Sequence, residues 1–461
     1  MKCLNEEQDV RKDNETTTSI THSSVPEFYA GKSVFITGGT GFLGKVFLEK
    51  LLYSCKDIVT IYVLIRDKKG KSAQQRIEEL VNKPLFTRLR SERPHDLKKL
   101  VPVVGDTSLP NLGISTEDEE ILIQKVTAVF HVAANVKFHE ELEIPVNTNI
   151  RGTSLVLDLC RRMENLEVFV HISTVFCHTS QKILEEKLYP PPAELSEVFK
   201  YLEQSNQDRR QLKTLLNGQP NTYTFTKALA ETYVAENHGN IPTVIVRPAI
   251  VTGSLKEPLP GWVDHWLGAT GLFAATAKGA NRVLLGNPNY NLDLIPVDYV
   301  ANLAIVAATR CRTDEVSIYN CCTSSCNPIT EGKIYEYLQI VCKNNGFDIP
   351  RLIFTENKLI LSIQTFLLQT TPAYFMDLVR RVRGKKPMYM KIQSQVVSVR
   401  NVLNYFTSRS WEMKADRTRE LHASLSSEDR LQFPCDPCHI DWEDYTNVYL
   451  KGIEQFLMVR K

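Results

Sequence analysis

Residues 34–44 read Val34-Phe35-Ile36-Thr37-Gly38-Gly39-Thr40-Gly41-Phe42-Leu43-Gly44. This apolar run ends in a glycine-rich turn, and a helical pattern follows at once over residues 45–52. In a strand–turn–helix unit the first glycine permits a tight turn, the second lets the backbone approach a diphosphate, and the third lets the helix pack closely on the strand. The free N–H groups and the dipole at the start of the helix favour an anion. The stretch therefore predicts a dinucleotide site at Gly38, Thr40, Gly41, Phe42, Leu43 and Gly44.

Strand and helix patterns continue to alternate through the first two thirds of the chain. Buried strands are expected at residues 34–37, 59–65, 100–104, 128–132, 166–172 and 241–248. This alternation is typical of an α/β protein with a doubly wound parallel (Rossmann) sheet, which binds ligands at the carboxyl ends of its strands.

The domain organisation follows from where this rhythm starts and stops. Residues 1–25 are polar and lack an apolar core, so we expect a disordered leader there. Residues 26–325 are expected to form the cofactor-binding domain with its substrate loops. The rhythm fades after residue 325, so residues 326–461 are expected to form a smaller, mainly helical C-terminal domain.

Composition limits the class of protein. The formal net charge of +2 provides no field that would attract nucleic acid, so no nucleic-acid partner is expected. Eleven cysteines without regular spacing indicate reduced thiols in a protein that faces the cytosol and is not secreted. Cys435, Cys438 and His439 lack a second ligand pair along the chain, so no metal is expected.

The residues at the strand ends indicate which dinucleotide binds. The second strand ends at Arg66, where an NAD enzyme usually carries an acidic residue for the ribose hydroxyls, whereas arginine suits a 2′-phosphate. Further positive charge follows at Lys68, Lys69, Lys71 and Arg76. We therefore predict NADPH, the alternative being a solvated basic loop. Asp106 at the end of the third strand is expected to meet the adenine, and Ala133 lets the fourth strand run close under the cofactor.

A second group of residues supplies the chemistry. Tyr223 and Lys227 lie one helical turn apart and face the same way. Tyr223 can donate a proton to a carbonyl oxygen that receives a hydride, if its pKa falls from about 10, and the charge of Lys227 would lower it. Ser173 or Thr174, at the end of the fifth strand, can hold that oxygen by a hydrogen bond. Asn149 is expected either to carry a water-mediated proton path behind the lysine or to start a helix.

These features, in this order, resemble the extended short-chain dehydrogenase/reductase superfamily. Longer stretches resemble the fatty acyl-CoA reductases of animals and insects and cover nearly everything after the leader: residues 28–32, 37–45, 130–138, 221–227, 258–264, 295–298, 372–377 and 440–445. One departure is Val175-Phe176, where the family commonly has Ala-Tyr. This change leaves the chemistry intact and reshapes the acyl channel.

The resemblance implies a reaction. A long-chain fatty acyl-CoA would be reduced by two NADPH to a primary fatty alcohol, through a hemithioacetal that loses CoA and an aldehyde. Tyr223 would be the acid, Lys227 its activator and Thr174 or Ser173 the oxyanion partner, while Arg66 and Arg76 would surround the 2′-phosphate. Two alternatives stay open: another extended reductase that acts on a sterol or sugar-nucleotide carbonyl, and a cofactor-bound scaffold without catalysis.

The C-terminal third raises the question of a membrane. An apolar segment over residues 358–368 precedes the basic cluster Arg380-Arg381-Val382-Arg383-Gly384-Lys385-Lys386. This combination suits peripheral contact with an anionic membrane, of the endoplasmic reticulum or peroxisome. A core helix followed by a solvated basic turn is the alternative. The chain ends without the hydrophobic anchor of some relatives, so stable membrane spanning is not expected.

Overall fold

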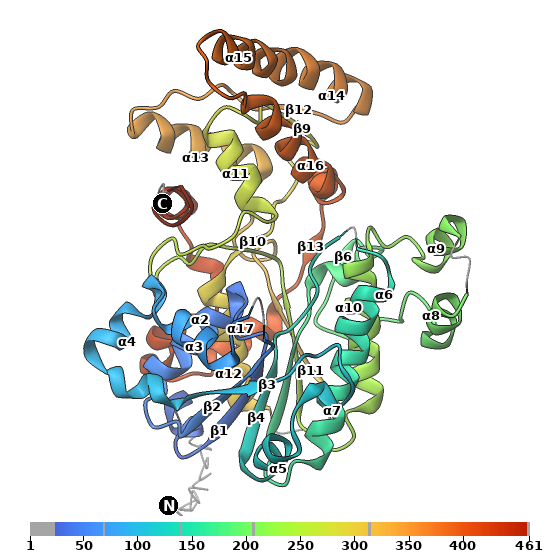
Figure 1. Ribbon diagram of the computed structural model, residues 1–461, viewed down its shortest axis with the longest axis vertical. Coiled ribbons are helices and arrows are strands. Elements are labelled where there is room, and N and C mark those ends of the chain that lie inside the picture. Colours follow the sequence, from blue (N-terminus) through green and yellow to red (C-terminus); the bar gives the residue numbers. More distant parts are fainter. Residues whose placement is uncertain (1–23, 68–69, 139, 205–207, 312–314, 459–461) are drawn as a thin grey trace, which may run out of the picture.

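The computed structural model describes residues 24–67, 70–138, 140–204, 208–311 and 315–458 (Figure 1). Lys68, Lys69 and residues 1–23 of the expected leader lie outside this part of the chain. Helix α1 (Val25–Tyr29) begins with a capping box at Ser24, and Val25 is fully buried. Residues 24 and 25 therefore belong to the folded protein.

Seven parallel strands form the central sheet, in the order β3-β2-β1-β4-β5-β7-β11. Their bounds are Ser33–Thr37 (β1), Thr60–Ile65 (β2), Leu100–Val104 (β3), Val126–His131 (β4), Val168–Ile172 (β5), Thr243–Pro248 (β7) and Ser317–Cys321 (β11). The order reverses between β1 and β4, and this crevice is where doubly wound folds bind ligands. The sheet confirms the predicted fold class. The strand β11 was not predicted, because the edge-strand sequence Ser-Ile-Tyr-Asn-Cys lacks a continuous apolar run.

Helices cover both faces of the sheet, which explains why its strands are apolar throughout. In β1, Val34 and Ile36 belong to one core and Phe35 belongs to the other, since successive side chains point to opposite faces. Helices α2 (Phe42–Ser54) and α12 (Val297–Arg310) pack on the first face. Helices α5 (Thr116–Lys125), α7 (Gly152–Arg162) and α10 (Thr222–Asn237) belong to the second.

Shorter elements complete the first part of the chain. They include helices α3 (Ala73–Val81), α4 (Thr87–Glu92), α8 (Leu195–Leu202), α9 (Arg209–Leu215) and α11 (Ala269–Ala277). Three two-stranded parallel sheets pair β8 (Ile250–Thr252) with β10 (Leu294–Pro296), β9 (Val283–Leu285) with β12 (Ile353–Thr355), and β6 (Ile183–Leu184) with β13 (Glu412–Met413). The last two pairs join segments from before and after residue 325.

The residues after 325 are mainly helical, as predicted. The helices are α13 (Glu331–Asn344), α14 (Lys358–Thr365), α15 (Thr371–Val382), α16 (Tyr389–Thr407), α17 (Asp416–Ala423), α18 (Ser427–Gln432) and α19 (Trp442–Gly452), and the π-helical turn η6 (Phe366–Thr370) joins α14 to α15. Figure 1 shows α14 and α15 at the end of the molecule farthest from β1. Among the helices described, each falls short of the length or apolar character required to cross a bilayer.

A buried carboxylate fastens the C-terminal region to the sheet. Glu186 accepts hydrogen bonds from the backbone N–H groups of Asn320 (2.9 Å), Arg417 (2.6 Å) and Thr418 (3.2 Å). The Thr418 hydroxyl donates to the same carboxylate at 3.0 Å. Because Glu186 follows β6 and Asn320 lies in β11, α17 is held against the edge of the sheet.

Candidate active site

A cavity of about 1110 Å³ opens at the carboxyl ends of the central strands. It brings together all the predicted cofactor and catalytic residues except Asn149. These are Gly38, Thr40, Gly41, Phe42, Leu43, Gly44, Arg66, Arg76, Asp106, Ala133, Ser173, Thr174, Tyr223 and Lys227. Residues more than 180 positions apart in the chain thus share one site.

The glycine turn leaves no room for side chains. Gly38 has a φ of 74°, and a Cβ there would lie 2.6 Å from the Ala133 nitrogen. A Cβ on Gly44 would lie 2.2 Å from the Gly38 carbonyl oxygen. Helix α2 begins with Gly41 as its N-cap, where no side chain caps the first turn. Backbone N–H groups therefore face the cavity at a helix N-terminus, which fits a diphosphate.

Positive charge gathers at the end of β2. Arg66 Nη1 lies 3.2 Å from Asp106 Oδ2, and the Arg66 side chain is 62% exposed. Arg76 donates to the Arg66 carbonyl oxygen and, at 3.5 Å, to the Thr40 hydroxyl. Burial raises the pKa of Asp106, but hydrogen bonds from Ser108 and Arg66 outweigh it and lower the pKa below its usual value. Two guanidinium groups thus flank the glycine turn, one of them facing an ionised carboxylate.

Tyr223 and Lys227 lie at the start of α10, which Asn221 caps by accepting from the Thr224 N–H group at 2.9 Å. Lys227 Nζ donates to the Ile172 carbonyl oxygen at the end of β5, at 2.6 Å. Burial lowers the pKa of Lys227 to about 8, against the opposing effect of Glu231. The side chain therefore titrates near physiological pH.

The expected lowering of the Tyr223 pKa is corrected by the structure. Burial raises the pKa of Tyr223, and Cys177 adds to this effect, while a hydrogen bond with the Thr174 side chain opposes both. Spacing along the helix predicted a neighbouring charge, but it did not predict how strongly the surrounding residues desolvate the partly buried phenol. Tyr223 consequently keeps its proton at neutral pH, as a proton donor must.

Ser173 and Thr174 point to different partners. Thr174 Oγ1 donates to the Pro248 carbonyl oxygen at 3.4 Å and accepts from the Phe176 N–H group at 3.3 Å, and its hydroxyl acts to lower the pKa of Tyr223. The Ser173 hydroxyl instead points to Cys177 Sγ at 4.0 Å. Of the two, Thr174 is the hydroxyl that affects the pKa of Tyr223.

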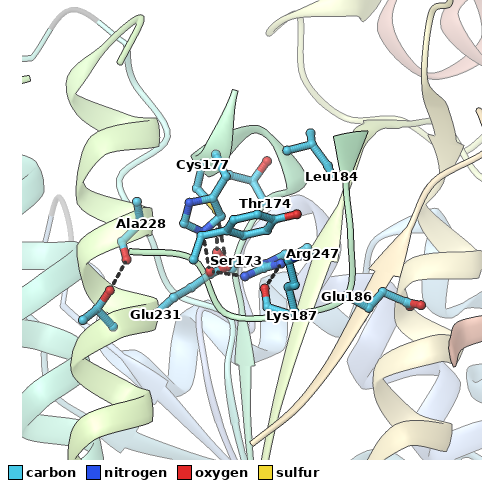
Figure 2. Close-up of polar contacts among 12 residues, drawn as sticks. Ser173, Thr174, Cys177, Leu184, Glu186, Lys187, Ala228, Glu231 and Arg247 are labelled. Atoms are coloured by element: carbon cyan, nitrogen blue, oxygen red, sulfur yellow. Dashed lines mark hydrogen bonds and ion pairs between the residues drawn. The ribbon is translucent and has the colours of Figure 1, made fainter. Parts of the chain in front are cut away.

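A buried network of charged residues surrounds Glu231 of α10 (Figure 2). Arg247 binds Glu231 with two nitrogens, at 2.9 and 2.7 Å, and His178 Nε2 lies 3.0 Å from the same carboxylate. Burial raises the pKa of Glu231, but Arg247 and His178 bring it well below its usual value. Arg247 also donates to the carbonyl oxygens of Glu185 and Lys187 at 3.2 and 3.0 Å. The network therefore joins α10 to the chain that follows β6.

Asn149 lies behind the cavity rather than in its wall. It belongs to the π-helical turn η4 (Val146–Arg151), and α7 begins three residues later at Gly152. Its side chain accepts from the Asn135 N–H group at 2.7 Å and donates to the Asn135 carbonyl oxygen and Thr226 Oγ1 at 3.1 and 3.0 Å. These contacts fix the loop after β4 against α10.

Several cavity residues were missed from the sequence. Phe138 stacks on Tyr223 with ring centroids 5.8 Å apart, and Phe138 also meets Phe406 of α16 at 5.7 Å. Asp264 pairs with Lys45 at 2.7 Å. Phe138 and Asp264 lie in stretches that carried the family resemblance, which was their only signal. Phe406 had no local signal, because α16 reaches the cavity through the tertiary fold alone.

Cys438 has neighbours that its sequence motif did not show. Ligand atoms of Cys438, Asp436 and Cys326 all lie within 4.8 Å of one another, whereas Cys435 is buried separately in the core. Burial raises the pKa of Cys438 above its usual value, and Asp436 adds to this effect.

The amino-acid sequence of the chain is similar to family models and to proteins of known name. Two family models, both described as male sterility protein, match residues 36–304 and 368–460. Rat fatty acyl-CoA reductase 1 is 38% identical over 444 residues, covering 94% of this chain and 86% of the relative. The Drosophila melanogaster fatty acyl-CoA reductase wat is 35% identical over 447 residues, covering 95% and 86%.

Solved structures agree on the fold. The terminal R domain of the myxalamid PKS-NRPS biosynthetic pathway gives a TM-score of 0.65 at 19% identity and covers 94% of this chain and 93% of that one. The reductase domain of a nonribosomal peptide synthetase from Mycobacterium tuberculosis gives 0.62 at 17% identity, with coverages of 94% and 96%.

Proposed function

The chain belongs to the fatty acyl-CoA reductase family, and from this premise we propose that it reduces a long-chain fatty acyl-CoA to a primary alcohol with NADPH. As a member of that family it is an oxidoreductase that uses a nicotinamide cofactor. The observation that carries the proposal is that Tyr223, Thr174, Lys227 and the glycine turn line one cavity.

NADPH fits the residues at one end of the cavity. The diphosphate would lie on the backbone N–H groups at the start of α2, where side chains at Gly38 and Gly44 would clash. Arg66 and Arg76 would bind the 2′-phosphate, and Asp106 would lie near the adenine. When bound, the cofactor supplies the hydride that reduces the carbonyl carbon.

The acyl group would occupy the apolar part of the cavity. Its walls include Phe138, Phe176 and, from α16, Val399, Leu403 and Phe406. An apolar pocket with few polar groups is typical of a ligand that is mostly hydrocarbon. Phe176, which replaces the family's usual tyrosine, stacks edge-on against Phe406 with ring centroids 5.0 Å apart.

The two hydroxyl groups serve both reduction steps in this proposal. Thr174 donates a hydrogen bond to the thioester oxygen, and Tyr223 gives its proton to that oxygen as negative charge develops there. As the C–S bond of the hemithioacetal breaks, the Tyr223 phenolate takes the hydroxyl proton back and an aldehyde forms. CoA leaves as a thiolate that is protonated by solvent, so Tyr223 is again a proton donor. Thr174 and Tyr223 act on the aldehyde oxygen in the same way, which yields the alcohol. Lys227 orients the site through the Ile172 carbonyl group and adds positive charge.

The reaction is tested with purified full-length protein, NADPH and acyl-CoA of several chain lengths. We expect a primary alcohol by mass spectrometry, with two NADPH oxidised for each alcohol formed. Sterol ketones and sugar nucleotides are assayed in parallel. Reduction of one of these, with no alcohol from any acyl-CoA, would favour another extended reductase. A protein that binds NADPH and reduces nothing would favour the scaffold.

We also propose peripheral contact with a cytosol-facing membrane, such as that of the endoplasmic reticulum or peroxisome. The water-insoluble alcohol product supports this contact, as does the apolar and basic character of residues 358–386. The eleven cysteines of the chain lack regular spacing, which suits a reducing compartment.

A further inference from the structure

Helices α14 and α15, together with η6 between them, present large apolar side chains to solvent. Eleven of the twenty-seven exposed large hydrophobic residues in the described part of the chain fall within Lys358–Val382. They are Leu359, Ile360, Ile363, Phe366, Leu367, Tyr374, Phe375, Met376, Leu378, Val379 and Val382, and we call these residues the outer face. Phe375 is 59% exposed and Val382 is 82% exposed. Patches of this extent on a protein surface mark interaction sites.

The same helical segment turns polar residues inward. Its buried positions recur every four residues, at Leu361, Thr365, Gln369, Ala373 and Asp377. Such a helix is the reverse of an ordinary surface helix, which buries its apolar stripe and exposes its polar one. The inversion means that the outer face is not a core surface that failed to pack.

Each inward polar side chain has a fixed partner. Thr365 accepts from Arg400 of α16 at 3.0 Å, and Gln369 accepts from the Arg282 N–H group at 3.2 Å. Asp377 accepts from the N–H groups of residues 388, 389 and 390 at 2.7, 2.9 and 2.9 Å. These hydrogen bonds, together with the buried Leu361, attach the segment to the protein without using the apolar side chains of the outer face, which stay available for a partner.

Positive charge borders the outer face. Residues 358–391 contain seven lysines and arginines and one acidic residue, Asp377, whose carboxylate is held by the three N–H groups. The basic residues cluster where α15 ends, at Arg380, Arg381, Arg383, Lys385 and Lys386, with Lys391 in α16. A hollow of about 190 Å³ lies beside this cluster, lined by Arg381 and Lys391 together with Tyr374, Asp377, Leu378, Pro387 and Met390.

We propose that the outer face docks on a bilayer containing anionic phospholipids, with α14 and α15 lying in the plane of its surface. The apolar side chains would enter the acyl boundary and the basic border would meet the headgroup phosphates, the arrangement of an interfacial helix. Charge complementarity selects this occupant over a second copy of the chain, because two copies meeting at this face would bring two basic borders together.

The docked face would lie one helix away from the cavity. Helix α16 packs against α15 and η6 and also contributes Val399, Val402 and Leu403 to the cavity wall. Figure 1 shows α16 beneath α14 and α15, on the side that is nearer to the central sheet. Docking would therefore bring the cavity close to the membrane, where acyl-CoA and fatty alcohol partition.

Vesicle flotation without substrate tests the inference. Full-length protein is mixed with vesicles of phosphatidylcholine alone or with phosphatidylserine, and we expect binding mainly to the anionic vesicles. Phe375→Glu should lower the bound fraction at least about ten-fold, and Arg381→Glu by about five-fold or more. The matched controls are Leu431→Glu, at an 85% exposed leucine of α18, and Lys213→Glu, at an exposed lysine of α9. Both controls should bind like the wild type.

Three outcomes would overturn the inference. The wild type could fail to float with either vesicle, or Phe375→Glu could float as well as Leu431→Glu. The wild type could also be a dimer in light scattering without lipid, with Phe375→Glu converting it to a monomer, which would assign the face to a second copy. Unchanged circular dichroism shows that each variant is folded. The inference rests on the proposed membrane contact, and flotation is read without turnover, so its failure is distinguishable from failure of the proposed reaction.

Discussion

Replacing Arg66 by alanine should separate NADPH from NADH. Arg66 lies at the end of β2, paired with Asp106 at 3.2 Å, and Arg76 supports it through the Arg66 carbonyl oxygen. A hydrogen bond to a charged group contributes about 1.5–3 kcal/mol. Because the Arg66 side chain is 62% exposed, solvent screening places its contribution near the lower limit. About 1.5–2 kcal/mol corresponds to a loss of roughly 10- to 30-fold in NADPH affinity.

The loss should be specific to the phosphate. NADH lacks the 2′-phosphate, so its Kd should change by less than about two-fold, a few tenths of a kcal/mol. Removing Arg66 also frees Asp106, whose negative charge would then repel the 2′-phosphate and favour ribose hydroxyls. The ratio of the NADH Kd to the NADPH Kd should therefore fall, because the two Kd values do not rise in proportion.

Fluorescence titration of each cofactor, without acyl-CoA, measures these constants independently of the reaction. Lys71→Ala is the matched control, because Lys71 is a nearby cation that pairs with Glu79 and lies outside the cavity wall. Arg76→Ala should resemble Arg66→Ala, and the double variant should lose less than the sum of the two, since the residues touch. Equal losses for NADPH and NADH would refute the assignment of Arg66 to the 2′-phosphate.

Three further predictions concern the residues around α10. Tyr223→Phe should reduce kcat by about 10²- to 10⁴-fold and leave the NADPH Kd unchanged; retained turnover would remove Tyr223 as the acid. The pKa of Lys227 is lowered to about 8, so its ammonium loses its proton as the pH rises past that value, and kcat/KM should fall on the alkaline side; a profile flat to pH 10 would contradict a role for the charge. Glu231→Gln should lower the free energy of unfolding by about 3–5 kcal/mol in denaturant titration, because Arg247 loses its buried partner, whereas Glu79→Gln at an exposed pair should cost less than about 1 kcal/mol; equal effects would mean that the buried network does not stabilise the fold.

The sequence was most informative where structure follows from local chemistry. The glycine turn, six strands of the sheet and the pair Tyr223–Lys227 are local patterns, and the structure brings them to one cavity. The strand β11 was missed because an edge strand needs no continuous apolar run. The pKa of Tyr223 was predicted in the wrong direction because spacing places a charge nearby but does not measure burial.

Contacts between residues that lie far apart in the chain could not be predicted from the local sequence. Nothing around Glu186 indicates that its carboxylate would bind the N–H groups of residues 320, 417 and 418, which lie more than 130 positions away. Likewise, adjacent positions on a chain do not decide that the Ser173 hydroxyl faces Cys177 while the Thr174 hydroxyl faces the Pro248 carbonyl group. Both follow from the packing of α17 and α10 against strand ends.

In the C-terminal region, the inward position of the polar side chains affects two surfaces, which are the outer face and the cavity wall. Hydrophobicity alone left residues 358–368 equally compatible with a core helix and a membrane helix, because both are apolar. The structure argues against a core helix, since Thr365 and Gln369 point inward to bind Arg400 and the Arg282 backbone while large apolar side chains are exposed. Once these polar groups secure the segment, its apolar side chains are free to face outward, and the other side of α16 is free to line the cavity with Val399 and Phe406. A substitution such as Thr365→Val would therefore act on the attachment of the helix, while Phe375→Glu would act only on what the helix binds.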